Sequence, residues 1–240
     1  MDYSIVIPVY NNSNTLLELQ QLLMERLNKY PYSFEIIYVE DASTDNSLQI
    51  LKEIKSKTPI VKVIQLAYNH TQQISFYVGM KHAIGQHIIF ISADLQEEMN
   101  LLDNYILESK KNENTDLLIG YRIENKDYMV FKLLSILFYK IIRLKIKKIP
   151  ENGFDTICIR YQPLQKFLAI HQNNSFIQAE LVKCSNSVLP VSYIRLKSSN
   201  DKLNFRGLLS KIKYFVVSLS DVYFGNKDNS PIKYEIKEIF

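Results

Sequence analysis

The stretch HIIFISADLQ (residues 87–96) decides the fold class, because a short apolar run there ends abruptly in polar residues. Residues 88–91 predict a buried strand, and Ser92, Ala93 and Asp94 follow it directly. In an open α/β sheet, ligands bind just beyond the carboxyl ends of parallel strands, so a carboxylate here is expected to face a pocket. A carboxylate that meets a phosphate usually does so through a divalent cation. The alternative is that Asp94 caps the next helix at its N-terminus.

Strands and helices alternate regularly around this stretch. Runs rich in β-branched and aromatic residues predict strands, and leucine and isoleucine at helical spacing predict the helices between them. The expected strands are 3–9, 34–39, 61–66 and 88–91, and the expected helices are 13–29, 43–58 and 72–84. This β-α-β-α-β-α-β order predicts an α/β fold with a mostly parallel central sheet and helices on both faces.

In the second half of the chain, the predicted strands and helices alternate less regularly. The expected helices there are 101–110, 128–145, 163–170 and 205–222, and the expected strands are 116–121, 154–160 and 188–195. The tail from residue 225 is polar, and we expect it to be irregular. Because no repeat or low-complexity linker divides the chain, we expect one continuous domain.

The composition limits the classes of function. The 240 residues are 47% hydrophobic with a net charge of +4, which suits an anionic ligand but is too weakly basic to indicate nucleic acid. The two cysteines are too few for a disulfide framework or a metal cluster, which is typical of a reducing compartment. The N-terminus lacks a signal-peptide pattern and no apolar run reaches 18 residues, so we expect a cytoplasmic protein. The spacing of the six glycines permits neither GxGxxG nor GxxxxGK.

Three of the predicted strands deliver polar residues to the same edge of the sheet. These residues are Tyr10 with Asn11, Glu40 with Asp41, and Ser92 with Asp94. A carboxylate pair can accept hydrogen bonds from a base or from ribose hydroxyls, and a tyrosine ring offers a stacking face. Ordinary turn chemistry explains each cluster alone, but the convergence of all three predicts a binding site.

Eight motifs in register give the chain a resemblance to the inverting glycosyltransferases of family 2. They are IPVYNN (7–12), VEDASTDNS (39–47), LAYNHTQQISFYVGM (66–80), ISADLQEE (91–98), GYR (120–122), NGFD (152–155), NNSFIQAE (173–180) and NFRGLLSKIKYF (204–215). The chain looks most like the polyprenyl-phosphate branch, which is similar to dolichol-phosphate-mannose synthase. We expect no counterpart here of the transmembrane helices that follow in many lipid-linked members. The resemblance implies a GT-A fold, a nucleotide-sugar donor and a Mg²⁺ or Mn²⁺ ion on its diphosphate.

The resemblance also implies a division of the chain into two halves. Residues 1–224 would form a single GT-A domain, followed by a C-terminal tail at 225–240. Within the domain, residues 1–122 would bind the nucleotide sugar, and residues 123–224 would lie on the acceptor side.

The same resemblance assigns roles to individual residues. Asp94, the second acid of the family's D-x-D, would bind the metal, and Asp155 would be the general base that takes the acceptor proton. The substrate-binding residues would be Pro8, Tyr10, Glu40 and Asp41 around the nucleoside, Ser92 and Gln96 beside the metal and sugar, and Arg122 and Arg195 as cationic contacts.

Departures from the family pattern leave two hypotheses for the function. Ser92 replaces the first acid of D-x-D, Tyr68 replaces an arginine, and a cationic loop is reduced to Arg195, Lys197 and Lys202. The first hypothesis is an enzyme that transfers a sugar to a lipid-linked or saccharide acceptor in cell-envelope polysaccharide synthesis. The second is a catalytically impaired relative that binds a nucleotide or sugar, or partners an active transferase.

Two apolar helices with basic ends also have two interpretations. The helix 128–145 is followed by a basic run to Lys148, and the helix 205–222 carries Lys211 and Lys213. Each helix can be a core element whose basic residues complement the helix dipole. Alternatively, an apolar face flanked by cations can lie on an anionic membrane, which predicts peripheral contact at its inner face.

Overall fold

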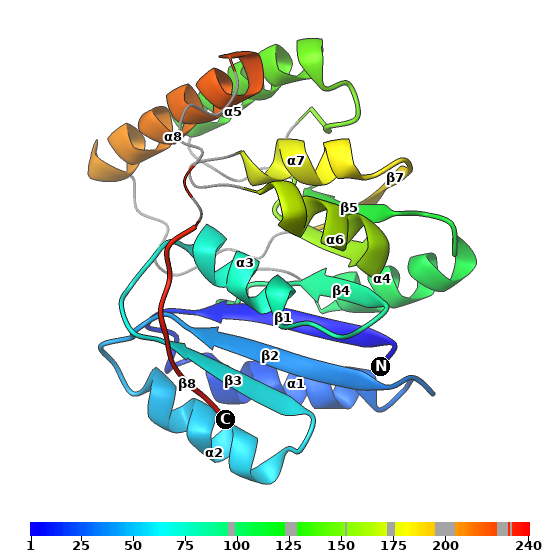
Figure 1. The fold of residues 1–240 in the computed structure, drawn as a ribbon, viewed down its shortest axis with the longest axis vertical. Coiled ribbons are helices and arrows are strands. Elements are labelled where there is room, and N and C mark those ends of the chain that lie inside the picture. Colours follow the sequence, from blue (N-terminus) through cyan, green and yellow to red (C-terminus); the bar gives the residue numbers. More distant parts are fainter. Residues whose placement is uncertain are drawn as a thin grey trace.

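The computed structural model describes residues 1–95, 99–122, 129–151, 153–171, 176–194, 205–224, 230 and 232–240. Within these residues the chain forms an eight-stranded sheet in the order β7-β5-β6-β4-β1-β2-β3-β8 (Figure 1). The strands are β1 (Tyr3–Val9), β2 (Phe34–Glu40), β3 (Val61–Leu66), β4 (His87–Phe90), β5 (Leu117–Arg122), β6 (Thr156–Arg160), β7 (Val188–Tyr193) and β8 (Ile236–Ile239).

The sheet is mostly parallel, which confirms the prediction. β1 pairs in parallel with both β2 and β4, β2 pairs in parallel with β3, and β5 pairs in parallel with β7. β6 runs antiparallel to its two neighbours, β4 and β5, and β8 runs antiparallel to β3. The reversal of β6 brings its first residues to the edge where β4 ends.

Helices cover both faces of the sheet, as the alternating pattern predicted. They are α1 (Leu16–Leu27), α2 (Ser47–Lys57), α3 (Gln72–Lys81), α4 (Asn100–Lys111), α5 (Met129–Lys145), α6 (Tyr161–Ile170), α7 (Ile177–Cys184) and α8 (Phe205–Phe224). The apolar sides of α1, α2 and α4 share one buried cluster, and those of α3, α5, α6, α7 and α8 share another. Side chains alternate between the two clusters along the strands: Ile5 and Ile7 lie in the first, and Val6 in the second.

The C-terminal tail corrects one expectation. We expected irregular structure after residue 225, but β8 adds an edge strand to the sheet. Backbone hydrogen bonds in both directions join Phe240 to Val63. An edge strand needs little apolar patterning, since most of its side chains stay in solvent, and Lys237 and Glu238 are indeed exposed. The sequence pattern also gave no indication of α7. None of the described helices is long and apolar enough to cross a membrane.

Candidate functional site

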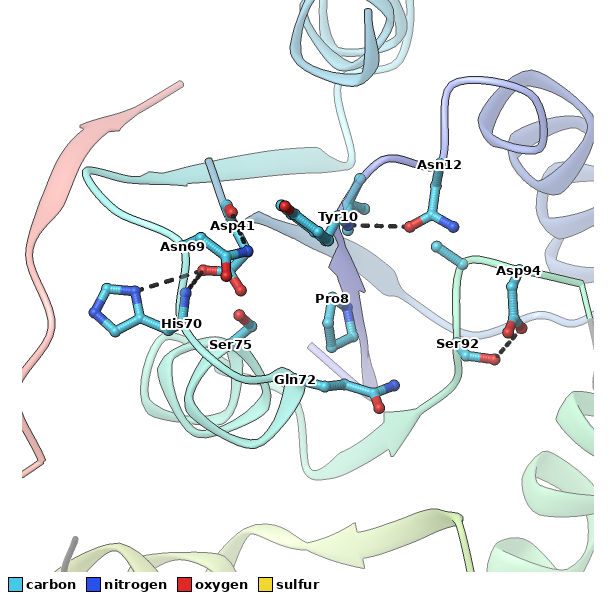
Figure 2. Close-up of a pocket in the computed structure, with 12 residues that line it drawn as sticks. Pro8, Tyr10, Asn12, Asp41, Asn69, His70, Gln72, Ser75, Ser92 and Asp94 are labelled. Carbon is cyan, nitrogen blue, oxygen red and sulfur yellow. Dashed lines mark hydrogen bonds and ion pairs between the residues drawn. The ribbon is translucent and has the colours of Figure 1, made fainter. Parts of the chain in front are cut away.

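A cavity of about 320 Å³ lies at the carboxyl ends of β1, β2 and β4. Its lining residues come from the segments after β1, β2, β3 and β4: Pro8, Val9, Tyr10, Asn12, Asp41, Asn69, His70, Gln72, Ser75, Ser92, Ala93 and Asp94. In Figure 2, Asp41, Asn69 and His70 form one side, and Ser92 and Asp94 the other. Five of the predicted site residues therefore line one cavity: Pro8, Tyr10, Asp41, Ser92 and Asp94.

Hydrogen bonds tie the loop after β1 to the loop after β2. The backbone N–H of Asn11 donates to Ser43 Oγ at 3.1 Å, and Asn11 Oδ1 accepts from the N–H of Thr44 at 2.8 Å. The N–H of Ser13 donates to Asp45 Oδ2 at 3.0 Å. Burial opposes ionisation of Asp45, but hydrogen bonds from Ser47 and Ser13 outweigh it and lower its pKa to about 2. The two loops are thus held in place without a ligand.

The backbone is strained once after each of the three strands. Asn11 after β1, Ala42 after β2 and Leu95 after β4 have φ angles of 54°, 54° and 56°. A residue other than glycine costs about 1 kcal/mol in this left-handed region. Such strain persists only where the surroundings fix the chain, and it is frequent at ligand sites. It marks the same three loops that the strand-end pattern selected.

Asp41 provides a buried carboxylate on one side of the cavity. Its side chain is 4% exposed, and Oδ1 accepts a hydrogen bond from the backbone N–H of His70 at 2.8 Å. His70 Nδ1 lies 3.5 Å from the same oxygen and 2.6 Å from the Tyr68 carbonyl oxygen. That carbonyl can only accept, so Nδ1 carries a proton. Burial raises the pKa of Asp41, and the contacts with His70 oppose this rise.

Asn69, His70 and Gln72, which follow β3, also line the cavity but were not predicted as site residues. Their motif LAYNHTQQISFYVGM contributed to the family resemblance, but none of its residues was given a role. The Asn69 side-chain amide donates to the Asp41 carbonyl oxygen at 3.2 Å. The loop is also anchored at its start, where the N–H of Ala67 donates to the Glu235 carbonyl oxygen at 2.9 Å. Because this bond comes from the far end of the chain, no local pattern could have revealed it.

Asp94 stands on the opposite side of the cavity from Asp41. Ser92 Oγ donates to Asp94 Oδ1 at 2.7 Å, so the serine that replaces the first acid of D-x-D orients the second acid. Thr15 Oγ1 donates to the carbonyl oxygen of Ala93 at 2.7 Å and fixes the intervening backbone. The Asp94 side chain remains exposed. An exposed, oriented carboxylate can meet a cation.

The chemistry of this donor set fits a cation held jointly with a substrate. No cluster of three or more His, Cys, Asp or Glu side chains suited to a metal occurs in the described part of the chain. Mg²⁺, however, commonly binds through one or two carboxylates, with substrate phosphates and water completing its octahedron. Asp94 supplies such a carboxylate, and the Ser92 hydroxyl lies beside it.

Glu40 is the predicted nucleoside ligand that the structure places away from the cavity. Its side chain is buried, and Oε1 accepts a hydrogen bond from the N–H of Ser43 at 2.6 Å. Strand alternation explains this position: Glu40 shares the parity of Tyr38, which packs in the cluster of α1, α2 and α4. Asp41, one residue later, turns toward the cavity.

Asp155 lies at the same sheet edge, just before β6. Phe90 of β4 pairs with Ile157 of β6, so continuing the antiparallel register places Asp155 opposite Ser92. Its side chain is exposed, and Oδ2 accepts a hydrogen bond from the Tyr193 hydroxyl at 3.2 Å. Asp155 does not itself line the cavity formed by the described residues.

The remaining predicted residues are only partly described. Arg122 is the last residue of β5, where its backbone pairs with Tyr193, and the structure does not describe its side chain. Gln96 and Arg195 lie outside the described residues. Their predicted contacts stay predictions.

Fold and site together define an α/β protein with a polar, two-carboxylate cavity at the carboxyl ends of its parallel strands. Residues 4–171 match the family model described as "Glycosyl transferase family 2". The chain therefore belongs to glycosyl transferase family 2.

The curated relatives include glycosyltransferases of bacteria and phages. An "Uncharacterized glycosyltransferase YkcC" of Bacillus subtilis is 34% identical over 197 residues, covering 81% of this chain and 60% of the relative. A "Bactoprenol glucosyl transferase" of Shigella phage SfV is 23% identical over 209 residues, covering 86% of this chain and 67% of the relative. The match thus leaves 40% of YkcC outside the alignment.

Solved structures share the fold. One is S. aureus TarS 1-349 in complex with UDP-GlcNAc, with a TM-score of 0.55, 20% identity, and coverage of 90% of this chain and 66% of TarS 1-349. Another is the mannosyltransferase PcManGT from Pyrobaculum calidifontis with GDP-Man and Mn²⁺, with a TM-score of 0.62, 11% identity, and coverage of 95% of this chain and 65% of PcManGT. The sheet is thus that of GT-A glycosyltransferases, as predicted.

Proposed function

We propose that this chain is an inverting glycosyltransferase that moves a sugar from a nucleoside-diphosphate sugar to a lipid-linked or saccharide acceptor. The observation that carries the proposal is the single cavity in which Asp41 and Asp94 face each other from two strand ends (Figure 2). A nucleotide sugar has matching parts: a base and ribose at one end, and a diphosphate that needs a counter-charge at the other.

The Asp41 side would bind the nucleoside. Its carboxylate is an acceptor for an N–H of the base. The backbone N–H of His70 already orients this carboxylate, and the Asn69 amide holds the Asp41 backbone carbonyl. The exposed ring of Tyr10 offers a stacking surface between this side and Asp94, and Pro8 lies beneath it (Figure 2). Glu40 would act indirectly, because its carboxylate holds the loop that carries Asp41.

The Asp94 side would hold the diphosphate through a Mg²⁺ or Mn²⁺ ion. When bound, such an ion neutralises the negative charge of the departing diphosphate. The role of Ser92 would be to fix the Asp94 carboxylate by its hydrogen bond. Gln96, Arg122 and Arg195 are proposed as further contacts to the sugar and diphosphate, by their place in the family motifs.

Asp155 would act as the general base. The acceptor oxygen attacks the anomeric carbon as the bond to the diphosphate oxygen breaks, and the proton of the acceptor passes to the Asp155 carboxylate. Attack opposite the leaving group inverts the configuration. The Tyr193 hydroxyl orients the Asp155 carboxylate. A hydroxyl acceptor needs this base more than an ionised phosphate acceptor does.

A lipid-linked acceptor has the support of one relative. The phage SfV protein is named as a glucosyl transferase of bactoprenol, a polyprenol lipid. We extend this acceptor class to the present chain, together with peripheral contact at the inner face of a membrane and a role in cell-envelope polysaccharide synthesis. Membership of the branch similar to dolichol-phosphate-mannose synthase stays a prediction.

The alternative is a catalytically impaired relative that binds a nucleotide or sugar, or partners an active transferase. The replacement of an acid by Ser92 motivates it. The names of the relatives favour an active transferase instead, and the Ser92–Asp94 hydrogen bond gives the serine a positive role.

Calorimetric titration with UDP, GDP and dTDP, each with and without Mn²⁺, tests the proposal. We expect one nucleotide to bind with a Kd of about micromolar size only when Mn²⁺ is present. Asp94→Ala should abolish the Mn²⁺-dependent binding, because it removes the protein's carboxylate for the ion. The matched control is Glu53→Ala, which removes an exposed carboxylate on α2 and should change nothing.

Two results would contradict this proposal. If a folded sample binds none of the nucleotides, there is no donor site. If a nucleotide binds with Mn²⁺ but the corresponding nucleotide sugar is neither hydrolysed nor used for transfer, the impaired relative is the better description.

A further inference from the structure

A second cavity, of about 470 Å³, lies at the end of the sheet opposite Asp41 and Asp94. It is formed where β4 begins and the antiparallel β6 ends, between the last turn of α4 and the first turn of α6. β1 and β4 start side by side here, at the end of the sheet that carries the N-terminus in Figure 1. None of the described residues lines both cavities, so the proposed donor site gives this one no role.

Lys110 of α4 and Arg160 of β6 bring two cationic side chains to this second cavity. Lys110 Nζ lies 4.6 Å from the centre of the Tyr32 ring and 5.8 Å from that of Tyr3. An aromatic ring attracts a cation without neutralising it, and no ion pair joins Lys110 to a carboxylate among the described residues. Arg160 pairs with Asp116 at 3.7 Å, but its side chain stays 32% exposed. Both cations therefore remain able to bind an anion.

His87 lies beside both cations. Its backbone pairs with that of Arg160 across the sheet, and its ring stacks at 5.3 Å on Tyr3, the ring that Lys110 also contacts. Both ring nitrogens are buried, and neither has a hydrogen-bond partner in the part of the chain that the structure describes. Most buried polar atoms in folded proteins are hydrogen-bonded, and an exception can mark the place of a bound ion.

The charges around His87 favour a negative ligand. Burial lowers the pKa of His87 to about 4, and Lys110 and Arg160 contribute to this shift, whereas Asp2 opposes it. Two cations thus act on the ring against one carboxylate. A positive potential at a partly enclosed cavity attracts anions.

The carboxylates near the cavity are mostly engaged elsewhere. Asp2 Oδ2 accepts hydrogen bonds from the N–H and the hydroxyl of Ser33, at 2.8 and 2.7 Å. Asp116 Oδ2 accepts from the N–H of Asn186 at 2.8 Å. Glu113 lines the cavity as an exposed side chain, where solvent and salt screen its charge. These carboxylates therefore reduce the positive potential without cancelling it.

We propose that Lys110 and Arg160 bind the phosphate group of a small molecule in this second cavity. Ammonium and guanidinium groups form strong, charge-assisted hydrogen bonds with phosphate oxygens, and a phosphate dianion matches two cations. The amides of Asn114 and Gln162 line the same cavity and can hydrogen-bond the rest of the ligand.

The two cavities differ in what a phosphate requires. The cavity of Asp41 and Asp94 offers carboxylates, so a phosphate would bind there through a divalent cation. The second cavity supplies positive charge from its own side chains, so it needs no metal. This difference makes the inference independent of the proposed function and allows one set of titrations to separate the two sites.

Proton NMR of the His87 ring tests the inference during a titration with sodium phosphate at about pH 8, where most phosphate is dianionic. Sodium chloride keeps the ionic strength constant, and EDTA removes divalent cations. The spectrum of His87→Phe identifies the His87 signals among those of the four histidines. We expect these signals to shift saturably with a Kd of about 1 mM, and acetate, a monoanion, to bind at least about 10-fold more weakly.

Variants of the two cations locate the phosphate. Lys110→Gln removes one of the two charges and should weaken phosphate binding by about 10-fold. The matched control is Lys111→Gln, the same change at the next residue of α4, whose exposed ammonium lies 3.9 Å from Glu108. Its Kd should stay within about 2-fold of the native value. Arg160→Lys keeps the charge but loses the planar fork, so we expect a loss of about 3-fold, and this variant decides if Lys110→Gln is unstable.

Three results would overturn the inference. The first is that the His87 signals show no saturable shift. The second is an equal Kd for acetate and phosphate, or for Lys110→Gln and Lys111→Gln, which would mean an adventitious ion only. The third is loss of phosphate binding in Asp94→Ala, which would place the phosphate in the other cavity.

Titration of UDP, GDP and dTDP with Mn²⁺ keeps the two proposals apart. Lys110→Gln should bind a nucleotide as the native chain does, because it leaves the cavity of Asp41 and Asp94 intact. If no nucleotide binds but phosphate shifts the His87 signals, only the proposed function fails. If a nucleotide binds but the His87 signals do not shift with phosphate, only the second site fails.

Discussion

The central strands and the outer helices differ in how fully their apolar residues are buried. All seven residues of β1 and all seven of β2 are buried. α5 and α8, in contrast, bury one side in the core and leave leucine, valine and phenylalanine exposed on the other. The strands bury their apolar residues in the core, and the polar side chains of the candidate site follow only where the strands end. The outer helices retain apolar surface after folding, so their outer side is available to a partner.

In the proposed function, the strand ends would bind the donor and the outer helices would contact a membrane surface. Asp41 and Asp94 project from loops that hydrogen bonds and neighbouring strands hold in place.

Asp155→Asn tests whether the second half of the chain supplies the general base. We expect kcat for hydrolysis of the donor to fall about 1000-fold, or about 4 kcal/mol, because water then lacks its base. The KM for the donor and the melting temperature should not change, since the side chain is exposed and the two residues are similar in size. Tyr193→Phe, which removes only the orienting hydrogen bond, should cost much less. An unchanged kcat in Asp155→Asn would exclude Asp155 as the base.

Phe138→Ala and Leu137→Ala compare the two sides of α5. Phe138 is 2% exposed and stacks on Phe215, so its truncation should destabilise the fold by about 3 kcal/mol in urea denaturation. Leu137, its neighbour in the sequence, is 56% exposed, and Leu137→Ala should cost less than about 0.5 kcal/mol. Equal losses would show that the outer side of α5 is packed in solution and is not available to a partner.

His87 should make the strand region sensitive to acid. Burial, with Lys110 and Arg160 nearby, lowers the pKa of His87 to about 4 from 6.5, while Asp2 opposes the shift. The neutral ring is therefore favoured in the folded state, so its contribution is complete above pH 6.5 and is lost as the pH falls toward 4. We expect a loss of about 2 kcal/mol over this range, allowing for solvent screening of the partly exposed ring.

Denaturation midpoints between pH 7 and 4 measure this effect. His87→Phe should flatten the dependence, because the phenyl ring keeps the stacking on Tyr3 and cannot be protonated. If His87→Phe and the native chain lose stability in parallel, other groups cause the acid sensitivity.

Ala42→Gly probes the strain in the loop after β2. The variant removes the cost of a left-handed φ of 54°, but it also adds freedom to the unfolded chain. We expect a small net gain of about 0.5 kcal/mol. Ala93→Gly is the control, since Ala93 is buried without a positive φ and should lose about 1 kcal/mol. Destabilisation by Ala42→Gly would mean that the Ala42 methyl group is important for packing.

Local pattern predicted most of the fold because each strand and helix of the first half carries its own period. Continuous β-branched and apolar runs predicted β1 to β4, leucine and isoleucine at helical spacing predicted the helices between them, and the strand ends then located the cavity. The alternation of side chains along a strand could have separated Glu40 from Asp41, since consecutive residues of a strand point to opposite faces. The pair was instead predicted to act together.

By itself, the sequence of this protein determined the order of most of its elements, the mostly parallel sheet and the edge at which polar residues gather, because apolar runs, helical spacing and strand ends are local properties. Only the tertiary structure decided which distant segments meet there. It brought Asn69 and His70 against Asp41, reversed β6 so that Asp155 approaches Ser92, and tied Glu235 to the loop after β3. It also set α5 beside α8. These contacts depend on how separate elements pack, and backbone hydrogen bonds such as those of β8 leave no pattern of side chains in the sequence.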